Sequence, residues 1–313
     1  MKIIKPEKLK RGDCVGIVAP SDALLPFKKD AFKKGVRILE NFGFKVVFGK
    51  NIFKRHGDYM AGTDKERADD LNKMFAEKKI RGIFCLAGGS SANRLLPLVD
   101  FNNIKNNPKV FVGFSDITTL LLAIYVKTGL VTFHGPNVTS PALLNKFSQK
   151  SLFQIISEAK PIGKIIKNGD WSALKNGKAV FGNLVGGNLE IMVNLSGTEY
   201  FSKFKDSILF WEEYNEPVED IDMTLEHLKL TGALDGVRGM IAGKGNKMLG
   251  PSEYQHPLKL KQAILEIVES FKFPIIFNAD FGHVLNFVTL PIGIKAKLNP
   301  RDASLEILES AVI

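Results

Sequence analysis

The segment from Val110 to Thr119 reads VFVGFSDITT and contains the sharpest change of pattern in the chain. An apolar strand pattern ends at Gly113, and a helical pattern begins at Ile117. Ser115 therefore falls on a strand-to-helix turn, which places a side chain at the edge of a sheet and directs backbone N–H groups toward an oxyanion. Two interpretations remain open: Ser115 or Asp116 caps the helix, or Ser115 is a nucleophile.

This turn belongs to a strand–helix alternation that runs through the first 135 residues. Strands are predicted at Val15–Ala19, Lys45–Phe48, Gly82–Leu86, Val110–Gly113 and Val131–Phe133. Helices are predicted at Lys28–Asn41, Asp64–Glu77, Ser91–Val99 and Asp116–Tyr125. Repeated units of this kind predict an α/β fold, with a parallel sheet covered by helices on both faces. Ligands bind such sheets beyond the carboxyl ends of the strands.

The rest of the chain divides into a polar linker region at 140–178 and a second domain at 179–313, after an N-terminal domain at 1–139. The linker is expected to carry one helix, at Ser151–Ala159. In the second domain, Gly182–Asn188 is predicted to be a glycine-rich turn before a helix that begins at Leu189. Further strands are predicted at Ser207–Trp211, Gly239–Ala242, Ile275–Asn278, Gly293–Leu298 and Ser304–Leu308, and helices at Asp220–Leu230 and Leu258–Phe271.

Composition limits the classes of function. The formal charge of +10 permits a nucleic-acid partner, but the lysines are scattered without interleaved aromatics. We therefore expect a solvated basic surface that steers an anionic small substrate, and no nucleic acid. The apolar-rich run Ile117–Val126 is about half of a membrane span, and no signal peptide is visible, so we expect a cytoplasmic protein without a membrane partner. Cys14 and Cys85 lie in apolar runs and are predicted to be buried, and the sequence indicates neither a metal site nor a cofactor.

A serine nucleophile needs a base and an orienting carboxylate. His134 and His283 both follow predicted strands and flank glycine, and the residue pattern does not separate them. The other histidines, His56, His227 and His256, lie in polar or helical-surface settings and are expected to be bystanders.

The carboxylate has its candidates at the end of the strand Ser207–Trp211, where Glu212 and Glu213 follow. Neighbouring strand residues point to opposite faces, so only one of the two is expected to face a site. Both could instead mark the exit of the strand into solvent. A second glycine-rich turn, Ala87–Ser91, could bind an anion or line an oxyanion hole.

Several short motifs occur together in one order, and the chain resembles the serine LD-carboxypeptidases, the family of muropeptide LD-carboxypeptidases and the microcin C7 immunity protein. The matching segments are Gly16–Ser21, Gly88-Gly89 through Arg94–Pro97, Gly113–Thr118, His134–Pro136, Gly186–Leu189, Glu212–Pro217 and Gly282-His283. The resemblance implies an N-terminal parallel-sheet α/β domain, a smaller β-rich C-terminal α/β domain and an active site in the cleft between them. It also implies a homodimer.

The resemblance further implies a Ser115–Glu212–His283 triad and an oxyanion hole formed by the backbone N–H groups of Gly89 and Asp116. Three further residues, Gly88, Ser90 and His134, are then expected to lie near the substrate. The implied activity is removal of a terminal D-amino acid from cytoplasmic murein tetrapeptides during cell-wall recycling. One alternative is a hydrolase of peptidyl or aminoacyl nucleotide antibiotics; another is a non-catalytic two-domain protein that binds a small molecule.

Two departures from the family pattern concern the substrate. Muropeptide enzymes carry Arg-Gly-Gly-Tyr-Gly where this chain has Ala87–Ser91, and the following Ala92-Asn93 is closer to the microcin-immunity branch. Val218–Met223 replaces the usual Pro-Tyr-Arg-Ile-Asp-Arg. Both departures leave the implied triad unchanged.

Overall fold

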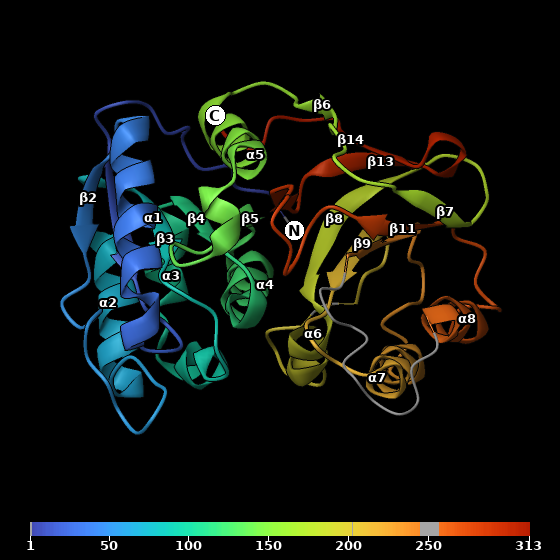
Figure 1. Cartoon of the computed structure of the whole chain (residues 1–313), viewed down its shortest axis with the longest axis horizontal. Helices are drawn as coiled ribbons and strands as arrows, with labels where there is room; N and C mark the ends of the chain where they lie inside the picture. Colours follow the sequence, from blue (N-terminus) through green and yellow to red (C-terminus); the bar gives the residue numbers. More distant parts are fainter. Residues whose placement is uncertain (1, 202, 245–256) are drawn as a thin grey trace. The chain divides into compact units, whose positions relative to one another are not determined.

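A computed structural model describes residues 2–201, 203–244 and 257–313. The chain forms two compact units (Figure 1). Unit 1 comprises Met1–Lys160, Phe287–Gly293 and Ser310–Ile313, and unit 2 comprises Pro161–Asn286 and Ile294–Glu309. Each unit combines helices with a sheet that contains parallel strands, so the α/β prediction is confirmed.

The described strands of unit 1 form a six-stranded sheet in the order β12-β5-β4-β3-β1-β2. Their bounds are β1 (Cys14–Val18), β2 (Lys45–Phe48), β3 (Ile80–Cys85), β4 (Val110–Gly113), β5 (Thr132–His134) and β12 (Leu290–Ile292). β1 to β5 pair in parallel, and β12 runs antiparallel to β5. The five predicted parallel strands are confirmed with ends shifted by at most two residues, whereas β12 was not predicted.

Helices cover both faces of this sheet (Figure 1). Phe84 of β3 lies 6.5 Å from Phe44, which also contacts Phe153, whereas Phe111 of β4 lies 5.9 Å from Phe75 (ring centroids). Because Phe111 pairs with Ile83, the neighbour of Phe84, the two aromatic side chains point to opposite faces. The helices of unit 1 are α1 (Lys29–Phe42), α2 (Asp64–Ala76), α3 (Phe101–Asn106), α4 (Thr118–Thr128) and α5 (Lys146–Ser157).

Two predicted helices of unit 1 differ in type or start. Ser91–Val99 forms a 3-10 helix, η2 (Ala92–Leu98), which contains Pro97; the missing N–H of proline disfavours an α-helix there. α5 begins at Lys146, because Asn145 caps it through bonds from the N–H groups of Phe147 and Ser148. α3 was not predicted; its N-cap is Asp100.

Unit 2 contains an eight-stranded sheet of described strands in the order β6-β14-β13-β8-β9-β10-β11-β7. The strands are β6 (Gly163–Lys164), β7 (Ser172–Lys175), β8 (Val180–Asn188), β9 (Ser207–Glu212), β10 (Gly239–Gly243), β11 (Ile275–Ala279), β13 (Lys295–Asn299) and β14 (Ser304–Ile307). The central strands β8 to β11 are parallel, and the outer strands pair antiparallel. The five further strands predicted for this half are confirmed; β6 and β7 were not predicted.

The predicted glycine-rich turn at Gly182–Asn188 is wrong, because this segment is part of β8. Its glycines permit close strand packing: a Cβ on Gly186 would lie 1.7 Å from the carbonyl oxygen of Phe210 in β9. The helix that begins at Leu189 is confirmed as α6 (Leu189–Leu195). α7 (Val218–Leu230) lies between α6 and α8 (Pro257–Ile267) and packs against both, as Figure 1 shows.

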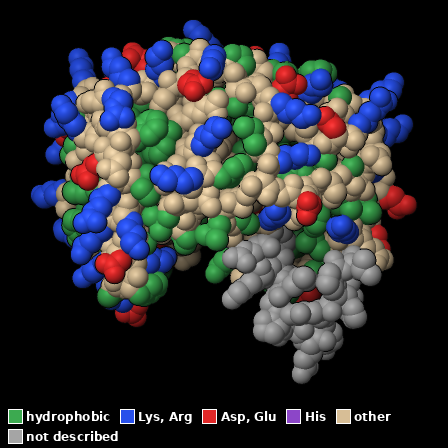
Figure 2. Space-filling model, turned by 45° about the horizontal axis from the view of Figure 1, so that its top comes forward, with side chains coloured by type: hydrophobic (Ala, Val, Ile, Leu, Met, Phe, Trp, Pro, Cys, Tyr) green, Lys and Arg blue, Asp and Glu red, His purple; other side chains and the backbone are tan. Residues whose placement is uncertain are grey.

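Charged side chains are spread over the surface in Figure 2, with Lys and Arg among apolar and acidic groups. No helix in the described part of the chain is long and apolar enough to cross a bilayer. Cys85 is buried as predicted, whereas Cys14 is partly exposed at the start of β1. His56 and His227 are exposed, and His256 lies outside the described residues.

α2 begins with a capping box: the Thr63 hydroxyl accepts the Glu66 N–H, and the Glu66 carboxylate accepts the Thr63 N–H. We expect Thr63→Ala to lower the free energy of unfolding by about 1 kcal/mol, because one N–H of the first turn loses its acceptor. Urea unfolding measures this change. Thr63→Ser keeps the hydroxyl and should stay near wild type; equal losses in the two variants would contradict the capping role.

Candidate active site

Ser115 sits at a strained strand-to-helix turn in unit 1. β4 ends at Gly113, Phe114 is extended, and Ser115 has φ of +64°, a left-handed conformation that costs a non-glycine residue about 1–3 kcal/mol. The 3-10 helix η3 (Ser115–Ile117) and then α4 follow directly. Such strain persists only where the surroundings enforce it, and it occurs often at functional sites.

Neither Ser115 nor Asp116 caps its own helix, so that interpretation is wrong. The N-caps of η3 and α4 are Phe114 and Ile117, without a side-chain capping bond. The buried Asp116 carboxylate instead accepts bonds through Oδ2 from the Ser21 hydroxyl at 2.5 Å and the N–H groups of Ser91 and Ala92 at 2.9 and 2.8 Å.

Asn137 and Gly88 hold the turn from two sides. The side chain of Asn137 bonds both the N–H and the carbonyl of Phe114, at 3.3 Å each. A Cβ on Gly88 would lie 2.8 Å from both Cβ and Oγ of Ser115 and 3.5 Å from the Asp116 nitrogen. Glycine is therefore required at position 88. The Asp116 N–H belongs to the first turn of η3, where N–H groups have no partner within the helix.

The glycine-rich turn after β3 is held at its base by a buried arginine, whereas its tip is exposed to solvent. Arg67 is buried, and its Nη1 donates to the Pro20 carbonyl at 2.7 Å and to the Ser91 hydroxyl at 2.9 Å. Gly89 and Ser90, two of the predicted substrate-binding residues, are exposed at the tip. The sequence pattern did not single out Arg67 or Asn137, since their partners are far along the chain.

Asp22 lies against this tip. A Cβ on Gly89, which has φ of +149°, would come within 2.1 Å of Asp22 Oδ1. Burial and then the charge of Asp116 raise the pKa of the Asp22 carboxyl; Lys28, the Ser90 N–H and Arg67 oppose the shift with smaller effects.

His134 lies beside the turn but packs behind it. The residue ends β5, its side chain is fully buried, and its ring lies 6.2 Å from Phe114 and 5.4 Å from Phe287. The ring therefore supports the packing of Phe114 and offers no exposed surface to a substrate in this conformation.

Glu212 and His283 form a close pair in unit 2. Glu212 is the last residue of β9 and is fully buried. His283 lies in the loop after β11, directly after Gly282. Glu212 Oε2 lies 2.7 Å from Nδ1 of His283 and also accepts the backbone N–H of that residue at 3.2 Å. The ring of Tyr214 packs against the imidazole, with 4.4 Å between the centroids and 32° between the ring planes. A hydrogen on Nδ1 leaves the lone pair of the neutral ring on Nε2.

The charge of Glu212 makes His283 a stronger base. Burial alone lowers the pKa of the imidazole, but the charge and hydrogen bond of Glu212, with the charge of Glu213, outweigh burial, and the net shift is upward from 6.5.

Glu213 does not point into solvent as one interpretation held. Its side chain is 3% exposed and accepts hydrogen bonds from Asn188 Nδ2 and from the N–H groups of Glu190 and Tyr214. Burial and then the charge of Glu212 raise the pKa of Glu213 to about 7.

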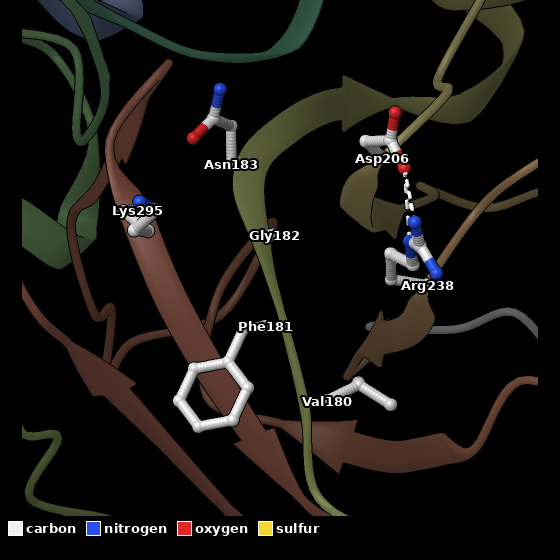
Figure 3. Close-up of a pocket in the computed structure, with 7 residues that line it drawn as sticks. All are labelled: Val180, Phe181, Gly182, Asn183, Asp206, Arg238 and Lys295. Atoms are coloured by element: carbon white, nitrogen blue, oxygen red, sulfur yellow. Dashed lines mark hydrogen bonds and ion pairs between the residues drawn. The ribbon is translucent and has the colours of Figure 1, made fainter.

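A separate pocket in unit 2 contains none of the predicted site residues. It has a volume of about 530 Å³ and is lined by Val180, Phe181, Gly182, Asn183, Asp206, Arg238 and Lys295 (Figure 3). Asp206 and Arg238 precede β9 and β10, so this pocket lies at the amino ends of the parallel strands. Glu212 and His283 follow the carboxyl ends, where parallel sheets bind their ligands.

Two family models match the chain. The LD-carboxypeptidase N-terminal domain matches residues 15–135, and the LD-carboxypeptidase C-terminal domain matches residues 181–298. The chain therefore belongs to the LD-carboxypeptidase family.

Relatives and solved structures agree with this assignment. A probable murein peptide carboxypeptidase of Bacillus subtilis is 33% identical over 98% of this chain and 95% of its own length. The microcin C7 self-immunity protein MccF of Escherichia coli is 28% identical over 95% of this chain and 94% of its own length. A structure of MccF in complex with aspartyl sulfamoyl adenosine superposes with a TM-score of 0.91 at 27% identity, covering 99% of this chain and all of that one.

Gly282 is a sensitive test of the Glu212–His283 geometry. Its φ is +102°, and a Cβ there would lie 2.6 Å from Oε2 and 2.7 Å from Cβ of Glu212. We expect Gly282→Ala to lower the free energy of unfolding by about 3 kcal/mol or more, from backbone strain and overpacking together. Urea unfolding measures the loss.

Gly197→Ala is the matched control. Gly197 has φ of +82°, and nothing lies within 4 Å of its added Cβ, so the variant bears the backbone strain alone. Its expected cost is about 1–2 kcal/mol. Equal losses at the two positions would show that Glu212 is not packed against Gly282.

Proposed function

We propose that this chain is a serine LD-carboxypeptidase that removes the terminal D-amino acid from murein tetrapeptides in the cytoplasm. The observation that carries this proposal is the buried carboxylate–imidazole pair of Glu212 and His283, because a protein that only binds a ligand does not need an imidazole with raised basicity. The relatives named murein peptide carboxypeptidase and murein tetrapeptide carboxypeptidase support the substrate class.

In the proposed mechanism, His283 accepts the hydroxyl proton through Nε2 while Ser115 Oγ attacks the carbonyl of the scissile amide. Glu212 stabilises the imidazolium, and the backbone N–H groups of Gly89 and Asp116 bind the oxyanion. Protonation of the leaving amine by His283 releases the D-amino acid, and water then hydrolyses the acyl-enzyme. The strained Ser115 turn and the exposed Gly89 support these roles.

Chain connectivity also supports the assignment of the base. Unit 2 ends its first segment at Asn286, three residues after His283, and the next residue, Phe287, packs at 5.2 Å against the ring of Phe114.

We also propose that the protein forms a homodimer, which sedimentation velocity would detect.

A second candidate function uses the same triad on a peptidyl or aminoacyl nucleotide. Two observations favour it: the Ala87–Ser91 turn lacks the Arg and Tyr of muropeptide enzymes, and the solved relatives that match most of the chain include MccF with bound aspartyl sulfamoyl adenosine. The difference between the two functions lies in the leaving group.

One assay separates these functions. We expect the wild type to release D-Ala from L-Ala-D-Glu-diaminopimelate-D-Ala, and Ser115→Ala to lose at least about 10⁴-fold of the rate. Amino-acid analysis measures the product. Cleavage of a peptidyl-adenylate analogue alone would favour the second function, and no turnover of either compound would leave a non-catalytic binding protein.

The dependence on pH tests the base. Protonated imidazole cannot accept the Ser115 proton, so kcat/KM should fall as pH drops through the His283 pKa. Since Glu212 and Glu213 raise that pKa, the midpoint of the acid limb should lie above 6.5. A pH series of kcat/KM for wild type measures it, and an acid limb well below pH 6.5 would contradict His283 as the base.

A further inference from the structure

The proposed mechanism leaves one buried group at the end of β9 without a role. Glu213 follows the proposed triad carboxylate directly, and its side chain is only 3% exposed. A buried carboxylate beside another carboxylate is costly, because each disfavours the charge of the other. The carboxylate is retained here despite that cost, and its hydrogen bonds show what it holds in place.

Asn188 joins the two glutamates. Its Nδ2 lies 2.8 Å from Glu213 Oε1 and 3.3 Å from Glu212 Oε1, while its Oδ1 accepts the N–H of Ile191 in α6. Glu212 is therefore held through Oε1 by Asn188 and through Oε2 by His283. The amide that contacts Oε1 is itself held by Glu213.

Glu213 also fixes the start of α6. Its Oε2 accepts the N–H of Glu190 at 2.9 Å, and its Oε1 also accepts the N–H of Tyr214 at 3.0 Å. These contacts join the end of β9 to the first turn of α6, on which Asn188 is the N-cap. The tilted ring of Tyr214 in turn packs against the His283 ring, so Glu213 is linked to both neighbours of the imidazole: to Tyr214 directly and to Glu212 through Asn188.

We propose that Glu213 is a positioning residue, which orients Glu212 through Asn188 and acts on His283 through its negative charge. This inference rests on the proposed triad. Among the described residues, the charged groups that interact with Glu213 are Glu212 and His283; Asn188, the last residue of β8, contributes its side-chain amide, and α6 contributes the Glu190 N–H. Because Glu213 titrates at about pH 7, its charge is present in the alkaline range and is lost on acidification.

The two effects of Glu213 can be separated by substitution. Glu213→Gln removes the charge and turns an NH₂ group toward donors, so kcat should fall about tenfold and the acid limb should move about one pH unit lower. Glu213→Asp keeps the charge on a shorter side chain; its acid limb should stay near wild type while its kcat falls. Glu219→Gln, an exposed acid in the first turn of α7, is the matched control and should change neither quantity.

The measurement is the pH dependence of kcat and of kcat/KM for murein tetrapeptide hydrolysis, with Ser115→Ala in parallel. An unshifted acid limb in an active Glu213→Gln would overturn the proposal for Glu213 and leave the triad intact. An inactive wild type would instead overturn the proposed function.

A titration of wild-type His283 by ¹⁵N NMR does not depend on activity or on the folding of a variant. We expect its imidazole shifts to depart from a single-site curve, with a second inflection near pH 7 from Glu213. A single-site curve would overturn the charge coupling.

Discussion

The candidate site depends on buried carboxylates that must receive hydrogen bonds from the loops around them. A desolvated charge costs several kcal/mol unless donors surround it, so each such group fixes the segments that supply its donors. Asp116 holds the β1 and β3 loops in unit 1. In unit 2, Glu212 and Glu213 hold α6 and the His283 loop, and Asp280 holds Trp171 and Lys244 at 2.8 Å each.

All four carboxylates lie at or just after the carboxyl end of a parallel strand, so rigid strands position the loops that carry the reactive groups. The strands supply fixed starting points, and the loops supply Ser115, the exposed Gly89 and His283. Strain at Ser115 is tolerated because Asn137 fixes Phe114 on one side and Gly88 packs on the other. Conformational strain and buried charge are thus balanced by specific contacts within each unit.

Local sequence patterns predicted the elements of this fold well where the spacing of apolar residues matched either a strand or a helix. The apolar strand at Val110–Gly113 and the capping box at Thr63 are both encoded within a few residues. Gly182–Asn188 was misassigned as a turn, because the sequence does not show that its glycines face a neighbouring strand. The short strands β6, β7 and β12 are defined by their pairing partners rather than by their own composition.

The candidate site was predictable only in part for the same reason. Ser115 stands out in the sequence because it lies between a strand and a helix. Glu212 and His283 stand out because they lie in motifs that match the family. Arg67 and Asn137 did not stand out, since each acts through backbone atoms brought near by the fold. Glu213 was noticed only as an alternative to Glu212, and its contact with Asn188 depends on the pairing of β8 with β9.

The central claim is that Ser115 becomes covalently acylated, and direct observation of that intermediate is its most direct test. Wild-type protein mixed with an ester of the murein tripeptide, whose fast acylation leaves deacylation rate-limiting, and quenched in acid should show, by mass spectrometry, a tripeptide adduct on the fragment that contains Ser115. Turnover of that ester with no adduct, or with an adduct on another residue, would contradict the account.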